Sequence, residues 1–436
     1  MMLVASCGEP SSPPGPFHLG GGGEYLWALS ADTFGVPGAS DVAILPSGGV
    51  GLVGTYTERV ALGDGQFAAA GMADLFLALL SSGGDVLWVR PFGTIRRDVG
   101  TILEATTGGE LAYFGESDAT ISLGGDSLPF EPALSTFYGR HSEAGAHAQS
   151  VRVQSRRAWS VTMDGSGDFV LLAADGENPG GSISRFSASG ERLWRQVVGP
   201  GFLNDVAFHN DGRIVGVGYD GAGPLSAARF ANGEGDAELD CYDYLPGAYT
   251  VVAMFSEDGA PLGRRVLTLA GETSCAWGKR VRVHASGDIV VGGECLGTVS
   301  TAVGDMDCLG GGAFLATLDV AGDVVAWTDL DGDLSITDLE VRDDGIALVG
   351  SFSGVADLGG GQFTAENSHS MYVARLDLQA RHIWSRRFGA FGEPRLALAS
   401  DGTLAVTSSF NGSVDFGDAR LDSSGTGGIF VVAFGQ

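Results

Sequence analysis

The chain has 436 residues, of which 25 are basic and 53 acidic, so its formal net charge is −28. A surface this acidic repels phosphate backbones and anionic lipid headgroups, which argues against nucleic-acid binding and against direct adsorption to a membrane. Glycine accounts for 71 residues without a collagen period, and no stretch shows sustained helical spacing of apolar side chains. The composition therefore predicts an all-β protein with many tight turns.

The first residues resemble a bacterial lipobox, because "LVASC" (3–7) places Cys7 where a lipidated cysteine would stand. Six residues before Cys7 are too few for a signal peptide, so we expect the true start to lie upstream; the alternative is an ordinary free thiol. The Pro, Gly and Ser content of 8–23 predicts a flexible tether. We therefore divide the chain into a lipobox remnant with its tether, 1–23, and a folded domain, 24–436.

The next segment, "LWALSADTFG" (26–35), looks like the end of a repeat unit without its beginning. Similar tails close later units at 87–93, 193–199 and 383–389. Seven glycine turns, each followed by an alternating apolar strand, begin the units at 48–54, 108–115, 166–173, 211–218, 286–293, 343–350 and 400–407. Each unit continues through a variable excursion, a third strand and a tail, so each is expected to form four short antiparallel strands.

Seven four-stranded units predict a seven-bladed β-propeller, whose radial closure leaves few free edges. The seventh unit has no tail after its third strand at 429–434, and the unmatched tail lies at 26–35. We therefore expect the N-terminal strand to complete the last blade and close the ring. The five tail tryptophans are expected to wedge between blades; they are Trp27, Trp88, Trp194, Trp327 and Trp384.

The repeats of the sixth and seventh blades, "GSFSGVADLGGGQFTAENSHSMYVARLD" and "SSFNGSVDFGDARLDSSGTGGIFVVAF", resemble the bacterial β-propeller repeat (SBBP-type) of cell-surface lipoproteins. The resemblance covers 24–436 and implies the propeller fold and a location at the outer membrane or cell surface, with periplasmic or secreted protein as the alternative. This family has no shared catalytic motif, so the resemblance assigns no site residues.

Acidic residues suggest two candidate sites near the blade junctions. Aspartates that precede the inner strands would form a carboxylate ring for a cation or cap their own turns; they are Asp41, Asp98, Asp205 and Asp338. The segment 329–340 has the ligand spacing of a calcium loop, although Leu334 replaces its turn glycine. Its candidate ligands are Asp329, Asp331, Asp333, Thr337 and Glu340. Calcium is the one cofactor that the sequence suggests, and an ordinary connection between blades is the alternative.

The excursions of the fourth and fifth blades combine acidic residues, tyrosines and cysteines. We expect two disulfides, Cys241–Cys275 and Cys295–Cys308, as in proteins of oxidising compartments. The candidate partner-binding residues are Asp240, Tyr242, Asp243, Tyr244, Asp305 and Asp307. Loops on a rigid scaffold commonly carry function, although a solvated acidic loop would look the same.

The sequence contains no catalytic motif, and the favoured function is a monomeric, non-catalytic, lipid-anchored propeller that binds a protein or a glycan through these rim loops. Two alternatives stay open. One is a structural spacer without a specific ligand. The other is a propeller glycosidase or lyase that uses paired carboxylates, which a pocket with two such groups and aromatic walls would favour.

Overall fold

The computed structural model describes most of the chain. The described residues are 18–34, 38–132, 135–174, 181–199, 201–220, 248–270, 274–366, 368–389, 392–423 and 425–436. Within these ranges the regular structure consists of β-strands with no helix, as the glycine-rich composition predicts.

Four of the sheets contain four antiparallel strands each, in sequence order from one edge to the other. The first comprises β3 (Gly38–Ile44), β4 (Val50–Tyr56), β7 (Asp74–Leu80) and β8 (Val86–Phe92). The second comprises β9 (Asp98–Ala105), β10 (Glu110–Ser117), β11 (Thr136–Ser142) and β12 (His147–Arg152). The third comprises β13 (Arg156–Met163), β14 (Phe169–Ala174), β15 (Ser182–Phe186) and β16 (Arg192–Val197). The fourth comprises β17 (Phe202–Phe208), β18 (Ile214–Asp220), β19 (Tyr249–Phe255) and β20 (Pro261–Val266).

A ten-stranded sheet follows, because one long strand belongs to two four-stranded groups. Strand β25 (Val324–Arg342) pairs with β24 (Gly304–Leu318) through its first half and with β26 (Gly345–Asp357) through its second. The two halves meet at Gly332, whose φ of 113° is unfavourable for other residues. The remaining strands are β22 (Cys275–Val283), β23 (Ile289–Thr301), β21 (Thr268–Ala270), β27 (Gln362–Thr364), β28 (Ser370–Leu376), β29 (His382–Phe388) and β1 (His18–Gly20).

The last large sheet joins the two ends of the described chain. Its order is β30 (Arg395–Leu398), β31 (Leu404–Phe410), β34 (Gly427–Phe434), β2 (Tyr25–Phe34), β5 (Arg59–Leu62) and β6 (Gly65–Ala68). Strand β2 pairs antiparallel with β34, with Ala28 opposite Val432. This is the pairing that the unmatched N-terminal tail predicts. A small hairpin of β32 (Ser413–Asp415) and β33 (Arg420–Asp422) lies between β31 and β34 in the chain.

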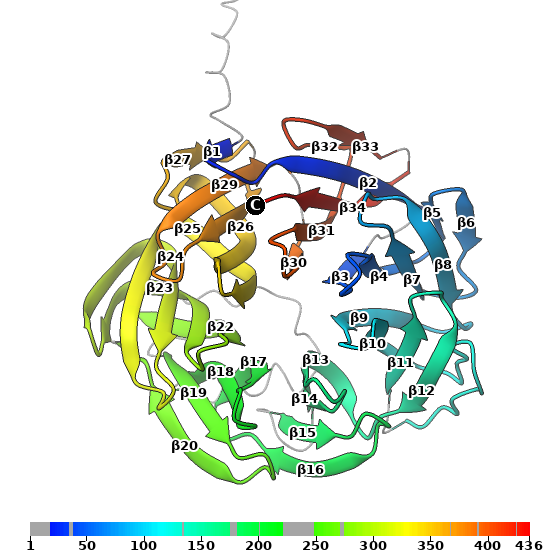
Figure 1. Ribbon diagram of the computed structural model, residues 1–436, viewed down its shortest axis with the longest axis horizontal. Helices are drawn as coiled ribbons and strands as arrows, with labels where there is room; N and C mark the ends of the chain where they lie inside the picture. The colour runs from blue at the N-terminus through cyan, green and yellow to red at the C-terminus, as the bar shows by residue number, and fades with distance from the viewer. Residues whose placement is uncertain are drawn as a thin grey trace, which may run out of the picture.

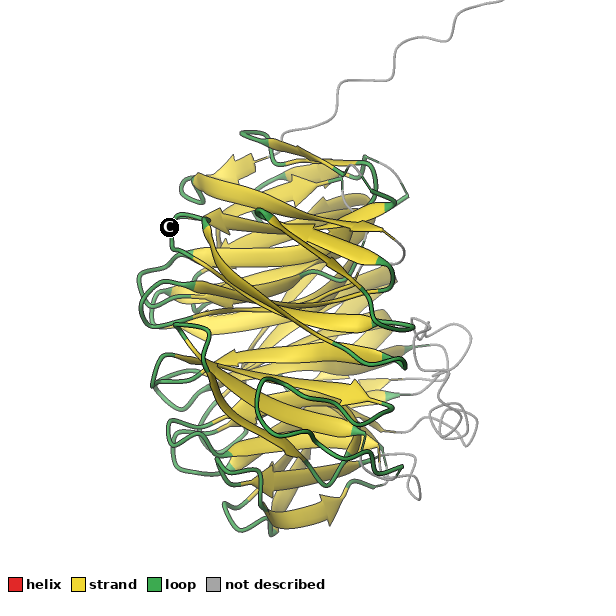
Figure 2. Cartoon of the chain, turned by 90° about the vertical axis from the view of Figure 1, so that its right-hand side faces the viewer, coloured by secondary structure: helices red, strands yellow, loops and turns green. Residues whose placement is uncertain are grey.

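The sheets are arranged radially around one axis, so the fold is a β-propeller (Figure 1). The strands nearest to the axis include β3, β9, β13, β17, β22 and β30. Seen from the side, the sheets stack as inclined layers around this axis (Figure 2). Neighbouring sheets share apolar cores; for example, Phe114 and Tyr138 of the second sheet lie 5.0 and 4.8 Å, between ring centroids, from Phe169 of the third.

Tryptophans of the outer strands connect neighbouring sheets, as the sequence predicts. The indole N–H of Trp27 donates to Ser82 O, and that of Trp88 to Glu143 O, each at 2.8 Å. The indole of Trp194 reaches Glu257 O in the same way. Each acceptor lies in the turn between the last two strands of the next sheet. Trp327 differs, because its ring stacks on Phe314 of its own sheet at 4.3 Å.

The segment before β2 also packs on the propeller. Strand β1, which falls within the predicted tether, pairs with the outer strand β29 so that Gly20 lies opposite Trp384. Gly23 donates to Gln436 O at 3.0 Å, and its own carbonyl accepts from Arg386 Nε at 2.8 Å. The residues from His18 onward are therefore held against two adjacent four-stranded groups.

Candidate functional site

The candidate site lies on the inner strands, where three aspartates occupy equivalent positions. A β-bulge shifts the register just before Asp41 in β3, Asp205 in β17 and Asp338 in β25. Bulges re-aim the side chains that follow them, and they are frequent near functional sites. The corresponding positions of the other inner strands hold Ile102, Ser160, Arg280 and, judged by its contacts, Arg395.

Each of these aspartates contacts the inner strand of the next sheet through Oδ2. The carboxylates accept hydrogen bonds from Leu103 N at 2.8 Å, Val281 N at 3.0 Å and Leu396 N at 3.0 Å, respectively. Asp41 and Asp338 also cap their own strands, since Oδ1 accepts from the following amide at 2.9 Å. Both interpretations of these aspartates, turn caps and a central group, therefore apply in part.

Asp98, the fourth aspartate of the predicted ring, belongs to a different group. Its Oδ2 accepts from the Thr94 amide at 2.6 Å and from the Thr94 hydroxyl at 2.7 Å. It precedes the bulge of β9, whereas the other three aspartates follow a bulge. The ring prediction is therefore corrected for Asp98.

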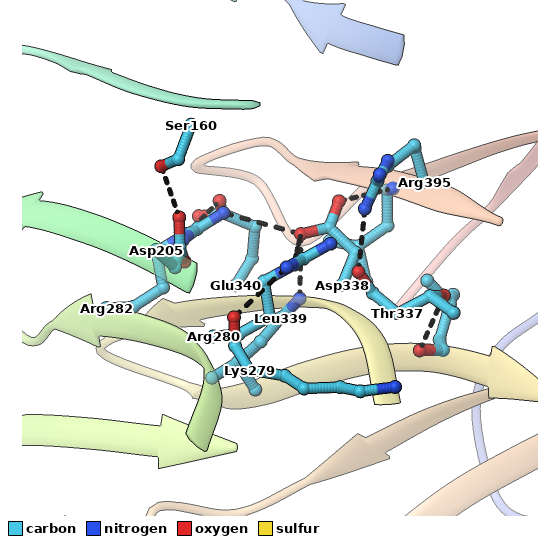
Figure 3. Close-up of polar contacts among 12 residues, drawn as sticks. Ser160, Asp205, Lys279, Arg280, Arg282, Thr337, Asp338, Leu339, Glu340 and Arg395 are labelled. Atoms are coloured by element: carbon cyan, nitrogen blue, oxygen red, sulfur yellow. Dashed lines mark hydrogen bonds and ion pairs between the residues drawn. The ribbon is translucent and has the colours of Figure 1, made fainter. Parts of the chain in front are cut away.

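Arg282 connects three of the central carboxylates (Figure 3). Its guanidinium donates to Glu340 Oε1 at 2.7 Å, to Asp205 Oδ2 at 2.8 Å and to Asp338 Oδ1 at 3.4 Å. Burial alone would lower the pKa of Arg282, but these carboxylates hold it well above its ordinary value. The network is only partly shielded, since about a quarter of the Arg282 and Glu340 side chains is exposed (26% and 25%).

Two further arginines complete the positive charge of the site. Arg280 Nε lies 3.8 Å from Asp338 Oδ1, and Arg395 donates to Thr337 O at 2.8 Å. Burial and the nearby Arg395 lower the pKa of Arg280. Asp205 also accepts from the Ser160 hydroxyl at 2.7 Å. Both carboxylate oxygens of Asp205 and of Asp338 therefore have hydrogen-bond partners.

Asp41 and Glu104 receive much less compensation. Burial and the charge of Asp338 raise the pKa of Asp41 to about 7, against opposing effects of Arg395 and two backbone amides. Burial raises the pKa of Glu104 to about 8, with added repulsion from Asp41 and Glu340 and an opposing effect of Arg282. Within the described chain no hydrogen bond or ion pair to the Glu104 carboxyl group is found. These two groups therefore have unused capacity for a positive charge.

The site is well suited to holding a cationic group and poorly suited to sugar stacking. Five carboxyl groups, those of Asp41, Glu104, Asp205, Asp338 and Glu340, face three arginines. The positions equivalent to Asp41 on the other inner strands, and those two residues further on, hold no Phe, Tyr or Trp. The aromatic walls expected of a glycosidase pocket are therefore missing from these positions.

The predicted calcium loop is not a loop in the structure. Asp329, Asp331, Asp333, Thr337 and Glu340 are spread along the single strand β25. An extended strand rises about 3.3 Å per residue, so the first and last of these side chains lie too far apart to share one ion. Asp333 instead contacts the Ser353 hydroxyl, and the Thr337 hydroxyl donates to Pro394 O at 2.8 Å. No cluster of three or more potential metal-ligating residues occurs in the described ranges.

The predicted partner-binding residues fall into two groups. Asp240, Tyr242, Asp243 and Tyr244 lie outside the described residues, as does Cys7. Asp305 and Asp307 are exposed on β24, near the tip of its hairpin with β23, and Asp305 accepts from the Ser300 hydroxyl at 2.8 Å. These two aspartates lie on a different part of the fold from the central charged residues.

The hairpin of β23 and β24 contains a disulfide between Cys295 and Cys308, with 5.8 Å between the Cα atoms. This is the pairing expected from the sequence. Cys275 is also disulfide-bonded, and its predicted partner, Cys241, lies outside the described residues. Cys275, Cys295 and Cys308 are all buried.

Sequence reasoning missed Glu104 and the arginines of the central site. The repeats can be aligned on the bulge of their inner strands. The position after the bulge then holds Ile102, Arg280 and Asp338, and the position two residues further on holds Glu104, Arg282 and Glu340. This alignment was the available signal.

Among the residues described, no helix has the length and hydrophobicity needed to cross a membrane.

Comparisons with known proteins do not identify a family for this chain. No protein-family model matches the chain, and no curated protein matches it. Among solved structures, the C-terminal WD40 domain of Sif2 is similar over 94% of this chain and 97% of that chain, with a TM-score of 0.44 and 10% sequence identity. A similarity this weak carries no argument about function.

Proposed function

We propose that this protein is a non-catalytic binding propeller that holds a cationic group of its partner between Asp41 and Glu104. The observation that carries the proposal is the Glu104 carboxyl group, which accepts no hydrogen bond and forms no ion pair within the described chain. Three carboxyl groups repel its charge, those of Asp41, Glu340 and Asp338, and only Arg282 opposes them. Repulsion among these groups is relieved when a positive charge enters. An ammonium or guanidinium group supplies both the charge and several hydrogen-bond donors.

The overall charge supports a basic partner. A net charge of −28 attracts cations from a distance, and it raises the rate at which a basic protein or peptide is encountered. A neutral glycan gains nothing from this field, and the inner-strand positions named above offer it no aromatic platform. Of the partners expected from the sequence, a protein with an exposed lysine or arginine is therefore favoured over a glycan.

Calorimetric titration with lysine-rich and arginine-rich peptides tests this function, with neutral oligosaccharides as the comparison. Glu104→Gln should weaken peptide binding about tenfold or more, the loss expected for one charge-assisted hydrogen bond. Glu191→Gln removes the same charge from an exposed position and serves as the matched control. The proposal is wrong if basic peptides do not bind, or if both variants weaken binding equally.

A second contact surface is supported by the hairpin of β23 and β24. Its disulfide restrains the strands, and Asp305 and Asp307 are exposed on it. A restrained loop loses less conformational entropy on binding. We propose that it contacts the same partner at the rim. Replacing Asp305 and Asp307 by alanine should then weaken binding of a folded partner and leave binding of short basic peptides unchanged.

The seven-bladed architecture and its closure are part of this proposal. The pairing of β2 with β34 supports a ring in which the N-terminal strand completes the last blade. The double role of β25 supports counting the ten-stranded sheet as two blades. The predicted envelope location and lipid anchor at Cys7 stay sequence-based predictions, and metabolic labelling with a radioactive fatty acid in cells tests them.

A further inference from the structure

Two loops lie side by side where the first sheet meets the second. Residues 69–73 precede β7, and residues 93–97 connect β8 to β9. Met72 N donates to Arg96 O at 3.1 Å, and Asp98 N donates to Ala73 O at 2.8 Å. Ala73 and Arg97 form a parallel bridge, so the next residues of the two segments, Asp74 and Asp98, are adjacent.

Both aspartates cap their own loops in the same way. Asp74 Oδ2 accepts from Ala70 N at 2.7 Å, and Asp98 Oδ2 accepts from Thr94 N at 2.6 Å, each four residues earlier. Asp98 Oδ2 also accepts from the Thr94 hydroxyl at 2.7 Å. Hydrogen bonds of this kind favour the ionised carboxylate over the protonated form.

The other oxygen of each carboxylate has no partner. Asp74 is 3% exposed and Asp98 is 0% exposed, and the Oδ1 atom of each is buried without a hydrogen bond from the described residues. Residues in register on parallel segments direct their side chains to the same side. Two desolvated carboxylates therefore lie together; burial raises the pKa of Asp74, and the charge of Asp98 adds to the effect.

A third buried oxygen belongs to Tyr56, the cross-strand partner of Asp74 in the pair of β4 and β7. This tyrosine is 0% exposed, and its hydroxyl has no hydrogen-bond partner in the described chain. Burial raises the pKa of the Tyr56 hydroxyl, and the charge of Asp74 raises it further. The hydroxyl thus lies close enough to the Asp74 carboxylate for its pKa to respond to that charge.

The nearby arginines donate to other groups, although the charge of Asp98 opposes the lowering of the Arg152 pKa by burial. Arg152 donates to the carbonyl oxygens of Ser117 at 3.1 Å and Ser135 at 2.7 Å. Arg97 pairs with Glu116 at 3.6 Å. Among the described residues, no ion pair to either aspartate is found. Arg152 offsets part of the charge of Asp98 without an ion pair, and because buried charges are costly unless compensated, the two carboxylates can still be stabilised by a further cation.

We propose that Asp74 and Asp98 bind a hard cation, with Ca²⁺ as the best-fitting class, between their Oδ1 atoms beside the Tyr56 hydroxyl. Such ions take carboxylate and other oxygen ligands. A proton shared by the two carboxyl groups is the competing explanation. The ion would join the loop of one sheet to the loop of the next and stabilise their junction. This site is separate from the central charged residues and does not depend on the proposed function.

The full chain, freed of metal with a chelator, should melt at a higher temperature after addition of calcium chloride alone, because an ion that binds only the folded state stabilises it. Asp98→Asn keeps an oxygen for the Thr94 amide but removes one charge, so this response should be lost. In chelator the variant should melt at or above the wild-type temperature, since the repulsion is relieved. Asp401→Asn changes an aspartate that caps an exposed turn and should keep the full calcium response.

Terbium luminescence gives a second measurement that does not require a stable variant. Terbium replaces calcium at oxygen sites, and excitation of a tyrosine beside the ion sensitises its emission. The wild-type protein should show emission that calcium displaces, and Tyr56→Phe should reduce it severalfold without abolishing the calcium effect on melting. Equal melting temperatures of the wild type in calcium and in chelator would overturn the proposal. A full calcium response in Asp98→Asn would overturn it as well and would favour the shared proton.

Discussion

Gly84 is predicted to be irreplaceable because Trp27 packs on the turn that contains it. A Cβ added at Gly84 would lie 2.6 Å from Cδ2 and 2.7 Å from Cε3 of the indole, closer than any real contact. The φ of Gly84 is 88°, which costs a residue with a side chain about 1–2 kcal/mol. Displacing the ring adds about 1–3 kcal/mol, as overpacking does elsewhere. Gly84→Ala should therefore destabilise the fold by about 2–5 kcal/mol in total.

Gly109→Ala separates the two contributions. Gly109 has a φ of 78°, yet a Cβ there would meet nothing within 4 Å. This control should lose only the backbone contribution, about 1–2 kcal/mol. Urea unfolding followed by tryptophan fluorescence measures both variants, and the difference between them is the cost of moving Trp27. Equal destabilisation of the two variants would refute the idea that the tryptophan fixes glycine at this turn.

Three other perturbations follow from the site and its supports. In the folded protein Glu104 has a pKa of about 8, above its ordinary 4.5, so the folded state keeps a proton that the unfolded chain has lost. The free energy of unfolding should therefore fall as pH rises between these values, by up to about 1.4 kcal/mol per pH unit. Urea titrations at several pH values measure this slope, and Glu104→Gln should flatten it. An unchanged slope in the variant would contradict the raised pKa of Glu104. Arg282→Met removes the cation that Glu340, Asp205 and Asp338 share, which leaves Arg280 near two of them, and should cost about 3–5 kcal/mol by the same assay. A loss below about 1 kcal/mol would mean that solvent compensates the three carboxylates. Replacing Cys295 and Cys308 by serine opens a short loop and should cost about 2–3 kcal/mol, to be checked by melting under non-reducing conditions; an unchanged melting temperature would show that the hairpin is stable without the bond.

The β-propeller and the pairing of β2 with β34 could be predicted because both rest on periodic features. Alternating apolar side chains between glycine turns predict β-strands. The unmatched tail at 26–35 has one partner available, the unpaired edge of β34. The continuous strand β25 could not be predicted. Its acidic residues have the spacing of a loop, and only the pairing with β24 and β26 holds them in an extended conformation.

The candidate site was less accessible to sequence reasoning, because charge pairing depends on which strands become neighbours. Asp41, Asp205 and Asp338 were visible as aspartates before inner strands. Glu104 and Arg282 come from inner strands of different sheets, far apart in the sequence, so their interaction has no local signature. The paired loops that end at Asp74 and Asp98 likewise depend on contact between two sheets.

The most direct test of the central claim is proton release on binding. In the unbound protein the pKa of Glu104 is about 8, so this side chain is mostly protonated near pH 7. A cation placed beside Glu104 favours the ionised carboxylate. A basic peptide that binds near pH 7 should therefore release about one proton per site. Titration calorimetry in two buffers of different ionisation enthalpy measures that number. The wild-type protein should release the proton and Glu104→Gln should release much less. Equal proton release by the two proteins, or none by either, would contradict a cationic partner at this site.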